Sequence, residues 1–334
     1  WKYRKKYRIG YYMKILIVGG AGYIGSHIGL EAINQGYEVT VFDDLSTGFK
    51  ENIHPSAKFF KGSTLFEKDL VEVMKNNSFD VVINLAGCKA AGESMTNPSK
   101  YAKNNIIGGI NLLKACSENG IDKFIFSSSA AVYGIPEYNP IDELHPVSPI
   151  NYYGYTKSLI ENNLKWFSAL KGIRYASLRY FNAAGFDTRK RIFKKEMNPQ
   201  NLIPIVMENA NGKREKLSVF GNDYDTKDGT GIRDYIHVSD LADGHLSSIK
   251  YISEKNKDLV INLGTGEGHS VLEIIDMTRK ISGKEINYNF TRRRDGDPNI
   301  VISGLDKAKE LINWNPKYSD LFTIIDSTWN IYNK

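Results

Sequence analysis

The sequence has 334 residues, 41% of them hydrophobic and 12% aromatic, as in a globular protein large enough for about two domains. It contains no apolar run as long as a membrane span. Its two cysteines, Cys88 and Cys116, cannot build a disulfide framework, so we expect a reduced protein in the cytoplasm. We expect no metal, no nucleic acid and no membrane among its partners.

The basic character of the chain is concentrated at its start. Five basic residues and no acid lie in residues 1–12, and without these five the formal net charge of +6 falls to +1. We expect residues 1–12 to be a basic leader that is not native, with Met13 as the natural start. A tail that binds nucleic acid or a membrane is the alternative.

A glycine-rich stretch, residues 19–25, follows the first predicted strand at residues 15–18 and precedes a helical pattern. In such a turn Gly19 permits the tight bend, Gly22 lets the backbone approach a pyrophosphate, and Gly25 lets helix and strand pack closely. The N–H groups of the helix N-terminus then face the phosphates. The pattern indicates a dinucleotide site, with an ordinary strand-to-helix turn as the alternative on the glycines alone.

The next predicted strand, residues 39–42, ends in Asp43, eighteen residues after Gly25. An acid at this place suits the ribose hydroxyls of NAD and repels the extra phosphate of NADP. We therefore predict NAD as the cofactor. The glycine spacing at 19, 22 and 25 resembles that of the extended short-chain dehydrogenase/reductase superfamily.

Strands and helices then alternate at the spacing of βαβ units. Strands are predicted at 58–60, 80–84, 123–126 and 174–180, and helices at 66–77, 104–119 and 152–170. The pattern predicts an α/β fold with a doubly wound, Rossmann-type parallel sheet. Because ligands bind outside the carboxyl ends of parallel strands, we expect Asp43, Ser129 and Asn182 to face one crevice.

Near residue 183 the regular alternation of strands and helices gives way to charged loops and shorter elements. Charged loops are predicted at 187–198 and 221–230, helices near 201–211, 238–253 and 270–281, and strands at 217–220 and 260–263. We interpret residues 13–182 as an NAD-binding Rossmann domain that also carries the catalytic pair. Residues 183–334 are interpreted as a smaller C-terminal α/β lobe that binds the substrate.

Tyr153 and Lys157 lie four residues apart on the predicted helix 152–170, and therefore on one face of it. A phenol is a poor base at neutral pH. A neighbouring ammonium and the positive nicotinamide of NAD favour the phenolate, which lowers its pKa. Ser129, at the end of the fifth strand, is placed to bind the same substrate hydroxyl. We predict these three residues as the catalytic group.

From Met13 onward the chain resembles the UDP-glucose 4-epimerase family. The segments that carry the resemblance are GGAGYIGSH (19–27), LAGCKAAGES (85–94), FIFSSSAAVYG (124–134), YYGYTK (152–157), LRYFNAAG (178–185), the long segment 220–245, INLGTGEGHSV (261–271) and RRRDGD (292–297). The segment around residues 233–237 is far more specific than the glycines.

The resemblance implies a role for many residues. At NAD it places Gly19, Gly22, Tyr23, Ile24, Gly25, Asp43, Asp44, Ser63, Thr64, Leu85, Ala86, Gly87, Lys89, Asn104, Tyr153, Lys157 and Phe181. At the UDP-sugar it places Ser129, Tyr153, Asn182, Asn201, Leu202, Ser218, Val219, Phe220, Arg233, Arg294, Asp297 and Val301. Guanidinium groups suit a pyrophosphate, although for one of the three arginines at 292–294 a surface charge run is the alternative.

The resemblance also implies a mechanism and an assembly. Tyr153 takes the proton of the sugar 4-hydroxyl while C4 gives a hydride to NAD, which forms a 4-ketose. The ketose rotates and takes the hydride back on the opposite face, so UDP-glucose and UDP-galactose interconvert. The family suggests a homodimer packed through the helices near 104–119 and 152–170.

Two positions depart from the family pattern. The position after Gly62 is usually an aspartate that binds the adenine amino group, whereas here it is Ser63, which predicts weaker retention of NAD. Four residues after Asp297 stands Val301, where a tyrosine in the family leaves no room for an acetamido group. The smaller valine predicts turnover of UDP-N-acetylglucosamine as well.

Three other functions compete with epimerisation. Nucleotide-sugar dehydratases carry an Asp-Glu pair after the serines, and Ala130 and Ala131 stand there instead. A silent NAD-binding sensor would have lost the catalytic group. An epimerase of another UDP-sugar, a pentose or a uronic acid, stays open. We interpret His27, His237 and His245 as structural, because none is accompanied in the sequence by other residues at the spacing of metal ligands.

Overall fold

The computed structural model describes residues 13–75, 77–294 and 296–333, so the expected basic leader at 1–12 lies outside the described residues. The structure is built on a seven-stranded sheet in the order β11-β6-β5-β4-β1-β2-β3. All six neighbouring pairs are parallel. The strands are β1 (Lys14–Val18), β2 (Glu38–Asp43), β3 (Lys58–Lys61), β4 (Val81–Asn84), β5 (Lys123–Ser129), β6 (Arg174–Tyr180) and β11 (Leu259–Leu263). The predicted doubly wound parallel sheet is confirmed.

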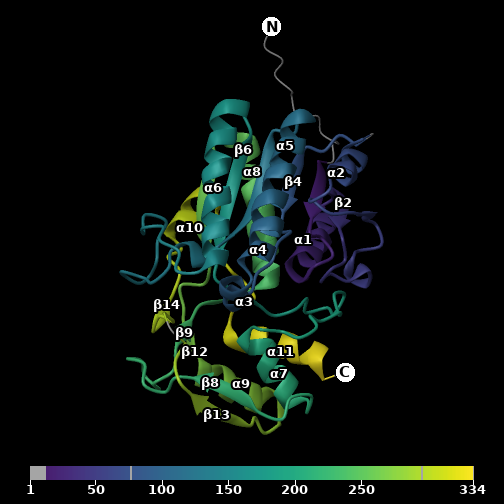
Figure 1. Cartoon of the computed structure of the whole chain (residues 1–334). Helices are drawn as coiled ribbons and strands as arrows, with labels where there is room; N and C mark the ends of the chain where they lie inside the picture. The colour runs from purple at the N-terminus through teal and green to yellow at the C-terminus, as the bar shows by residue number, and fades with distance from the viewer. Residues whose placement is uncertain (1–12, 76, 295, 334) are drawn as a thin grey trace.

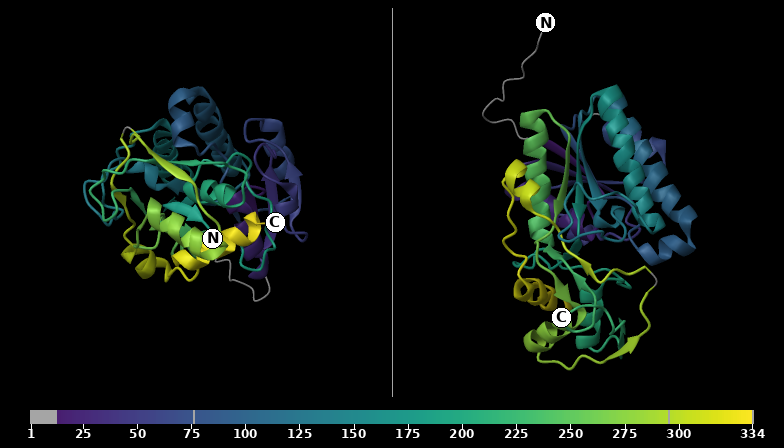
Figure 2. Two further views of the ribbon diagram at one scale, coloured as in Figure 1. Left: turned by 90° about the horizontal axis from the view of Figure 1, so that it is seen from below. Right: turned by 90° about the vertical axis from the view of Figure 1, so that its left-hand side faces the viewer.

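Helices cover both faces of this sheet, as the right-hand view of Figure 2 shows. Alternate residues of β1 point to opposite faces, so Ile15 and Ile17 belong to one core cluster and Leu16 and Val18 to the other. The first face is covered by α1 (Tyr23–Asn34), α8 (Val238–Lys255) and α10 (Asp306–Ile312), and the second by α2 (Glu67–Met74), α5 (Gly108–Glu118) and α6 (Tyr152–Lys171). Burial on both faces explains why the strands read as continuous apolar runs.

A smaller lobe lies beyond the carboxyl ends of the sheet strands, in the lower half of Figure 1. Its third core cluster joins α7 (Leu202–Ala210), α9 (Val271–Ser282) and α11 (Leu321–Tyr332) to the parallel pair β8 (Leu217–Phe220) and β13 (Tyr288–Thr291). Two further small sheets lie between this core and the large sheet. They are β12 (His269–Ser270) with β9 (Ile232–Arg233) and β14 (Ile300–Val301), and β7 (Asn182–Ala184) with β10 (Tyr235–His237).

The structure corrects the expectation that every element after residue 183 belongs to the second lobe. β11 pairs with β6 in the large sheet, and α8 packs against α1 and the first face of that sheet. The chain therefore leaves the large sheet after β6, builds part of the small lobe, and returns through β10 and α8. The apolar run of β11 needs burial on both faces, which only a place in the large sheet provides.

Several shorter elements differ from the predicted ones. The helix expected at 66–77 spans only α2, and the helix expected at 104–119 begins with a π-helical segment, η2 (Ala102–Ile107), that continues into α5. Six of the described helices were not predicted: η1 (Lys50–Asn52), α3 (Ala91–Thr96), α4 (Pro98–Tyr101), η3 (Ala130–Val132), α10 and α11. Among the described helices, none combines the length and the apolar character that a membrane span requires.

Candidate active site

The glycine turn between β1 and α1 has the geometry that a pyrophosphate needs. Gly19 has a φ of +81°, and a Cβ there would lie 2.8 Å from the backbone nitrogen of Ala86. A Cβ on Gly25 would lie 2.3 Å from the Gly19 oxygen, so only glycine lets the helix start so close to the strand. At its N-terminus α1 has no side-chain cap and no acid in its first turn. The first N–H groups of α1 therefore suit an anion, and the turn fits NAD.

Asp43 ends β2 directly beside this turn. Its carboxylate accepts hydrogen bonds from the backbone N–H of Ala21 at 2.9 Å and of Leu45 at 2.8 Å. Burial raises the pKa of Asp43, and these two hydrogen bonds oppose the rise. Asp43 thus braces the glycine turn in addition to lying where an NAD ribose is expected. Asp44 is exposed and accepts from the N–H of Ser46.

At the expected adenine end, the structure adds a carboxylate that the sequence analysis missed. The N–H of Ser63 donates to Oδ2 of Asp69, in the first turn of α2, at 3.0 Å. Thr64 is buried, and its carbonyl accepts from Nδ2 of Asn111 at 3.0 Å. The one sequence feature that could have pointed to Asp69 is its place in the first turn of a predicted helix, where the helix dipole favours negative charge.

The loop after β4 carries four of the residues expected at NAD, and a fifth, Asn104, lies in η2. Leu85 and Ala86 are half-buried; Gly87 has a φ of +146°, and a Cβ there would lie 2.8 Å from Oδ1 of Asn105. Asn105 also donates to Thr156 on α6, so it ties this loop to the catalytic helix. The structure directs the other two elsewhere: Lys89 pairs with Glu196 of the second lobe at 2.8 Å, and Asn104 donates to the carbonyl of Lys100.

The catalytic group is assembled where α6 begins beside the end of β5. The side chain of Asn151 caps α6 by accepting from the N–H of Gly154 at 2.8 Å, which fixes the first turn. Nζ of the buried Lys157 donates to the Ser127 carbonyl at 2.7 Å and lies 5.7 Å from the ring centre of Tyr153. The Ser129 hydroxyl hydrogen-bonds the Tyr153 phenol. The structure therefore brings the three predicted catalytic residues together.

The protonation of this group is set mainly by burial. Burial raises the pKa of Tyr153, and the hydrogen bond from Ser129 opposes the rise. Burial lowers the pKa of Lys157 to about 8, while Glu161 and Cys88 act to raise it. Burial thus works against the expected phenolate. The positive charges named in the prediction, Lys157 and an oxidised nicotinamide, have to overcome this effect.

A buried ion pair supports the catalytic helix from the sheet. Glu161, one turn beyond Lys157, accepts from Nη2 of Arg179 at 2.6 Å and from Nε at 3.0 Å. The Ser128 hydroxyl donates to the same carboxylate at 2.5 Å. Three consecutive serines therefore contact three successive turns of α6. Phe181, which follows β6, is buried beside Val132 and Tyr133.

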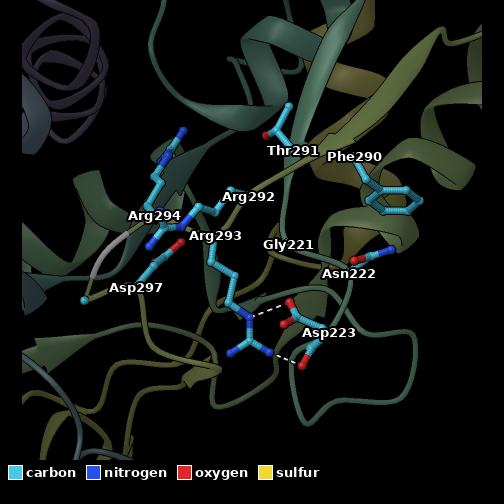
Figure 3. Close-up of a pocket in the computed structure, with 10 residues that line it drawn as sticks. Gly221, Asn222, Asp223, Phe290, Thr291, Arg292, Arg293, Arg294 and Asp297 are labelled. Atoms are coloured by element: carbon cyan, nitrogen blue, oxygen red, sulfur yellow. Dashed lines mark hydrogen bonds and ion pairs between the residues drawn. The ribbon is translucent and has the colours of Figure 1, made fainter.

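The arginines at 292–294 line a cavity of about 650 Å³ in the second lobe (Figure 3). Nε of Arg293 lies 2.6 Å from Oδ1 of Asp223, and the Arg293 guanidinium lies 4.0 Å from the ring centre of Tyr224. Arg294 is directed away from Asp223 and lies 4.0 Å from the ring centre of Phe220. Arg293 is therefore bound by protein groups. Arg294 instead lies against Phe220, which is also expected at the UDP-sugar.

Four more of the expected sugar-side residues, Asn182, Arg233, Asp297 and Val301, lie in or beside the two small sheets. Val301 pairs with Arg233 where β14 runs beside β9, and Asn182 pairs with Tyr235 where β7 runs beside β10. Arg233 forms an ion pair with Asp297. Because Ser129 pairs with Tyr180 in the large sheet, Asn182 follows only two residues beyond the level of the catalytic serine.

The remaining expected residues are more scattered. Asn201 and Leu202 begin α7, Ser218 is exposed on β8, and the side chain of Val219 is buried in the core of the second lobe. Tyr23 and Ile24 begin α1. The Tyr23 hydroxyl donates to the Gly185 carbonyl, and its ring packs against Phe186. Tyr23 thereby connects the glycine turn to the second lobe.

The structure places all three histidines in buried structural positions. Nε2 of His27 accepts from the N–H of Asp187 at 3.0 Å, and its Nδ1 lies 2.8 Å from the Tyr23 carbonyl. His237 caps α8, and His245 contacts the Leu241 carbonyl at 2.7 Å. Within the residues that the structure describes, no cluster of three His, Cys, Asp or Glu side chains has the arrangement of a metal site.

Fold and site together define a class of protein. A parallel sheet, a glycine turn after its first strand and a tyrosine–lysine pair on one helix are the features of a dinucleotide-dependent enzyme of the short-chain dehydrogenase/reductase type. The chain belongs to the NAD dependent epimerase/dehydratase family, whose model matches residues 15–264.

Individual relatives show which members of this family the chain is similar to. The chain is 42% identical over 319 residues to a UDP-glucose 4-epimerase of Streptococcus mutans, which covers 95% of this chain and 96% of that one. The crystal structure of a Brucella ovis UDP-glucose 4-epimerase in complex with NAD matches with a TM-score of 0.94 and 40% identity, over 96% and 98% of the two chains. A Campylobacter jejuni UDP-Glc/GlcNAc 4-epimerase matches with a TM-score of 0.85 and 40% identity, over 96% and 99%. The predicted family, fold class and NAD cofactor are confirmed.

Proposed function

We propose that this chain interconverts UDP-glucose and UDP-galactose by inverting C4 of the sugar, with NAD as a bound cofactor. The observation that carries the proposal is the contact of Ser129 with Tyr153, beside the buried ammonium of Lys157, at the carboxyl end of the sheet. The near full-length similarity to the Streptococcus mutans 4-epimerase supports it. Ala130 and Ala131, which follow Ser129 in η3, offer no acid for the water loss of a dehydratase.

In this reaction the chain's residues bind, orient and move one proton. Tyr153 removes the proton of the 4-hydroxyl, Ser129 orients that hydroxyl, and the Lys157 ammonium stabilises the phenolate. NAD, when bound, would supply a reversible hydride acceptor for C4. The residues that would hold it are the glycine turn, Asp43 and the loop after β4. Arg233 and Arg294 hold the nucleotide end while the sugar turns.

The same site suggests a wider substrate range. Val301 is half-buried on β14 next to Arg233, and a valine leaves more room than a tyrosine would. The similarity to the Campylobacter jejuni UDP-Glc/GlcNAc enzyme supports acceptance of N-acetylated sugars. UDP-N-acetylglucosamine and UDP-N-acetylgalactosamine are therefore proposed as a second substrate pair.

We also propose a homodimer that packs through α5, α6 and the preceding η2. Large apolar side chains are exposed on these elements: Ile107 is 53% exposed, Trp166 66% and Leu170 71%. Side chains of this size are often covered by a partner. A cytoplasmic location is proposed as well, supported by the two unpaired thiols.

Incubation of the purified protein with UDP-galactose tests the main proposal. We expect UDP-glucose to form without added NAD, because the cofactor is regenerated in each turnover. A panel of UDP-glucose, UDP-galactose and their N-acetyl counterparts then defines the range. The absence of turnover with all four sugars, in protein shown to contain NAD, would reject the proposed function.

A further inference from the structure

Asp234 is buried completely at the point where β9 ends and β10 begins. Its carboxylate accepts from the N–H and the hydroxyl of Thr265, both at 2.8 Å, from the N–H of Gly266 at 3.0 Å and from the N–H of Ser303 at 3.1 Å. All four groups that contact the carboxylate are hydrogen-bond donors. An ionised carboxylate, which only accepts, satisfies them, whereas an amide in its place would set an NH₂ group against N–H donors.

The backbone of the same residue holds two strands of the sugar side. The N–H of Asp234 donates to the Val301 carbonyl at 3.1 Å, and its carbonyl accepts from the N–H of Asn182 at 2.9 Å. Arg233 precedes it directly in the chain. One buried residue is therefore bonded to the segments that carry Asn182, Arg233 and Val301.

The packing around Asp234 leaves no room for it to move. A Cβ on Gly264 would lie 2.8 Å from Oδ2 of Asp234 and 2.4 Å from Cβ of Ser303, so the loop after β11 can approach the carboxylate only as glycine. The carboxylate thus joins the loop after β11 to the segment after β14, and the backbone of Asp234 joins these to β7, so a shift at Asp234 would move the sugar-side residues with it.

We propose that Asp234 is a positioning residue that fixes the spacing of Asn182, Arg233 and Val301. It thereby sets how tightly the UDP-sugar is held and which substituent is accepted at C2 of the sugar. The proposal rests on the function proposed above. It assigns to Asp234 a role in binding and selectivity, and no role in proton transfer.

The test compares Asp234→Asn with a matched control, Asp240→Asn. Asp240 is also buried, and it accepts from the N–H groups of Lys317 and Tyr318 and from the hydroxyl of Ser319, none of which is among the residues expected at the UDP-sugar. Both variants lose a buried carboxylate with backbone and hydroxyl donors, so both should lose some thermal stability and both should keep NAD.

We expect Asp234→Asn to raise the KM for UDP-galactose by about tenfold with a much smaller change in kcat, since ground-state and transition-state binding are lost together. The ratio of kcat/KM for UDP-glucose over UDP-N-acetylglucosamine should also change, whereas Asp240→Asn keeps the parental values. Equal kinetics of the two variants would overturn the proposal.

Two additions keep the test decisive. If Asp234→Asn does not fold, Thr265→Val removes only the hydroxyl donor and should also raise KM, by a smaller factor. A parental KM would then overturn the proposal.

If the parent turns over no UDP-sugar, the proposed function fails by itself. Calorimetric binding of UDP still tests the positioning of Arg233, and equal affinities for parent and Asp234→Asn would refute it.

Discussion

Glu161 and Arg179 form a buried, two-pronged ion pair between α6 and the sheet, with nitrogen–oxygen distances of 2.6 and 3.0 Å. Glu161 is the third member of a row on α6, after Tyr153 and Lys157. Each member of this row contacts one of the three serines that end β5. The ion pair therefore fixes the register in which the catalytic helix lies along the strand.

Replacing Glu161 by Gln should change the pH dependence of turnover. Glu161 acts to raise the pKa of Lys157, which burial lowers to about 8. Without the carboxylate, and with Arg179 left unpaired nearby, that pKa falls further. The ammonium is lost as the pH rises through it, so the alkaline decline of kcat/KM should begin at lower pH than in the parent. The measurement is a pH–rate profile of both proteins.

Glu118→Gln, on the exposed end of α5, serves as the matched control and should leave the profile unchanged. The same Glu161 variant should lose about 3–5 kcal/mol in the free energy of unfolding, because a buried guanidinium remains without its partner. An alkaline limb at the parental pH, with activity merely scaled down, would contradict a role of Glu161 in tuning Lys157.

Replacing Ser63 by Asp should slow the release of NAD. A carboxylate accepts a stronger, charge-assisted hydrogen bond than a hydroxyl, by about 1 kcal/mol, which corresponds to about fivefold in the dissociation rate. Asp69, bonded to the N–H of Ser63, moderates the gain by like-charge repulsion. The NAD content of parent and variant after dialysis and dilution checks this. Equal retention in both proteins would show that position 63 does not limit cofactor binding.

Replacing Val301 by Tyr should remove turnover of N-acetylated UDP-sugars and keep that of UDP-glucose. The larger ring would occupy the space beside Arg233 that we assign to the acetamido group. Val301→Thr, which keeps the size of the side chain, is the control and should retain both activities. The hypothesis fails if the parent converts only the non-acetylated sugars and Val301→Tyr behaves like it.

Stability should fall in mild acid because of the buried histidines. Burial lowers the pKa of His27, His237 and His245 from 6.5 to about 4. Between these values the unfolded chain binds protons that the folded chain does not, so stability is lost as the pH falls from about 6.5 to about 4. Each histidine contributes up to about 3 kcal/mol over this window.

Urea unfolding at pH 7 and pH 5 measures this loss. His245→Asn should flatten the difference between the two values, whereas the partly exposed His54→Asn should leave it unchanged. A free energy of unfolding that is the same at both pH values in the parent would mean that these histidines titrate normally in the folded chain.

The sequence was a good guide where the signal is local. Each strand of the large sheet, β11 included, could be located from its sequence, most of them because a doubly covered strand is a continuous apolar run. The turn at Gly19 could be located because its φ of +81° demands glycine. The assignment of β11 and α8 to the second lobe was wrong, since an apolar run does not say which sheet it joins. The Tyr153–Lys157 pair was visible because its members lie one helical turn apart.

The partners of the site residues were not visible in the sequence. Glu161 meets Arg179, Lys89 meets Glu196 and Asp234 meets Thr265 only after folding, because each pair joins segments far apart in the chain. Nothing in the local pattern distinguishes these acids from solvated ones. The raised pKa of Tyr153 was also out of reach, since it depends on burial that the fold creates.

The central claim is that Tyr153 is the base of an NAD-dependent epimerisation at C4. Its most direct test is the rate at which Tyr153→Phe converts UDP-galactose to UDP-glucose, measured together with its NAD content. We predict that turnover falls by at least about 10²-fold, because the proton acceptor is lost, while NAD and UDP remain bound as in the parent. A variant that holds NAD and still converts UDP-galactose at the parental rate would contradict the claim.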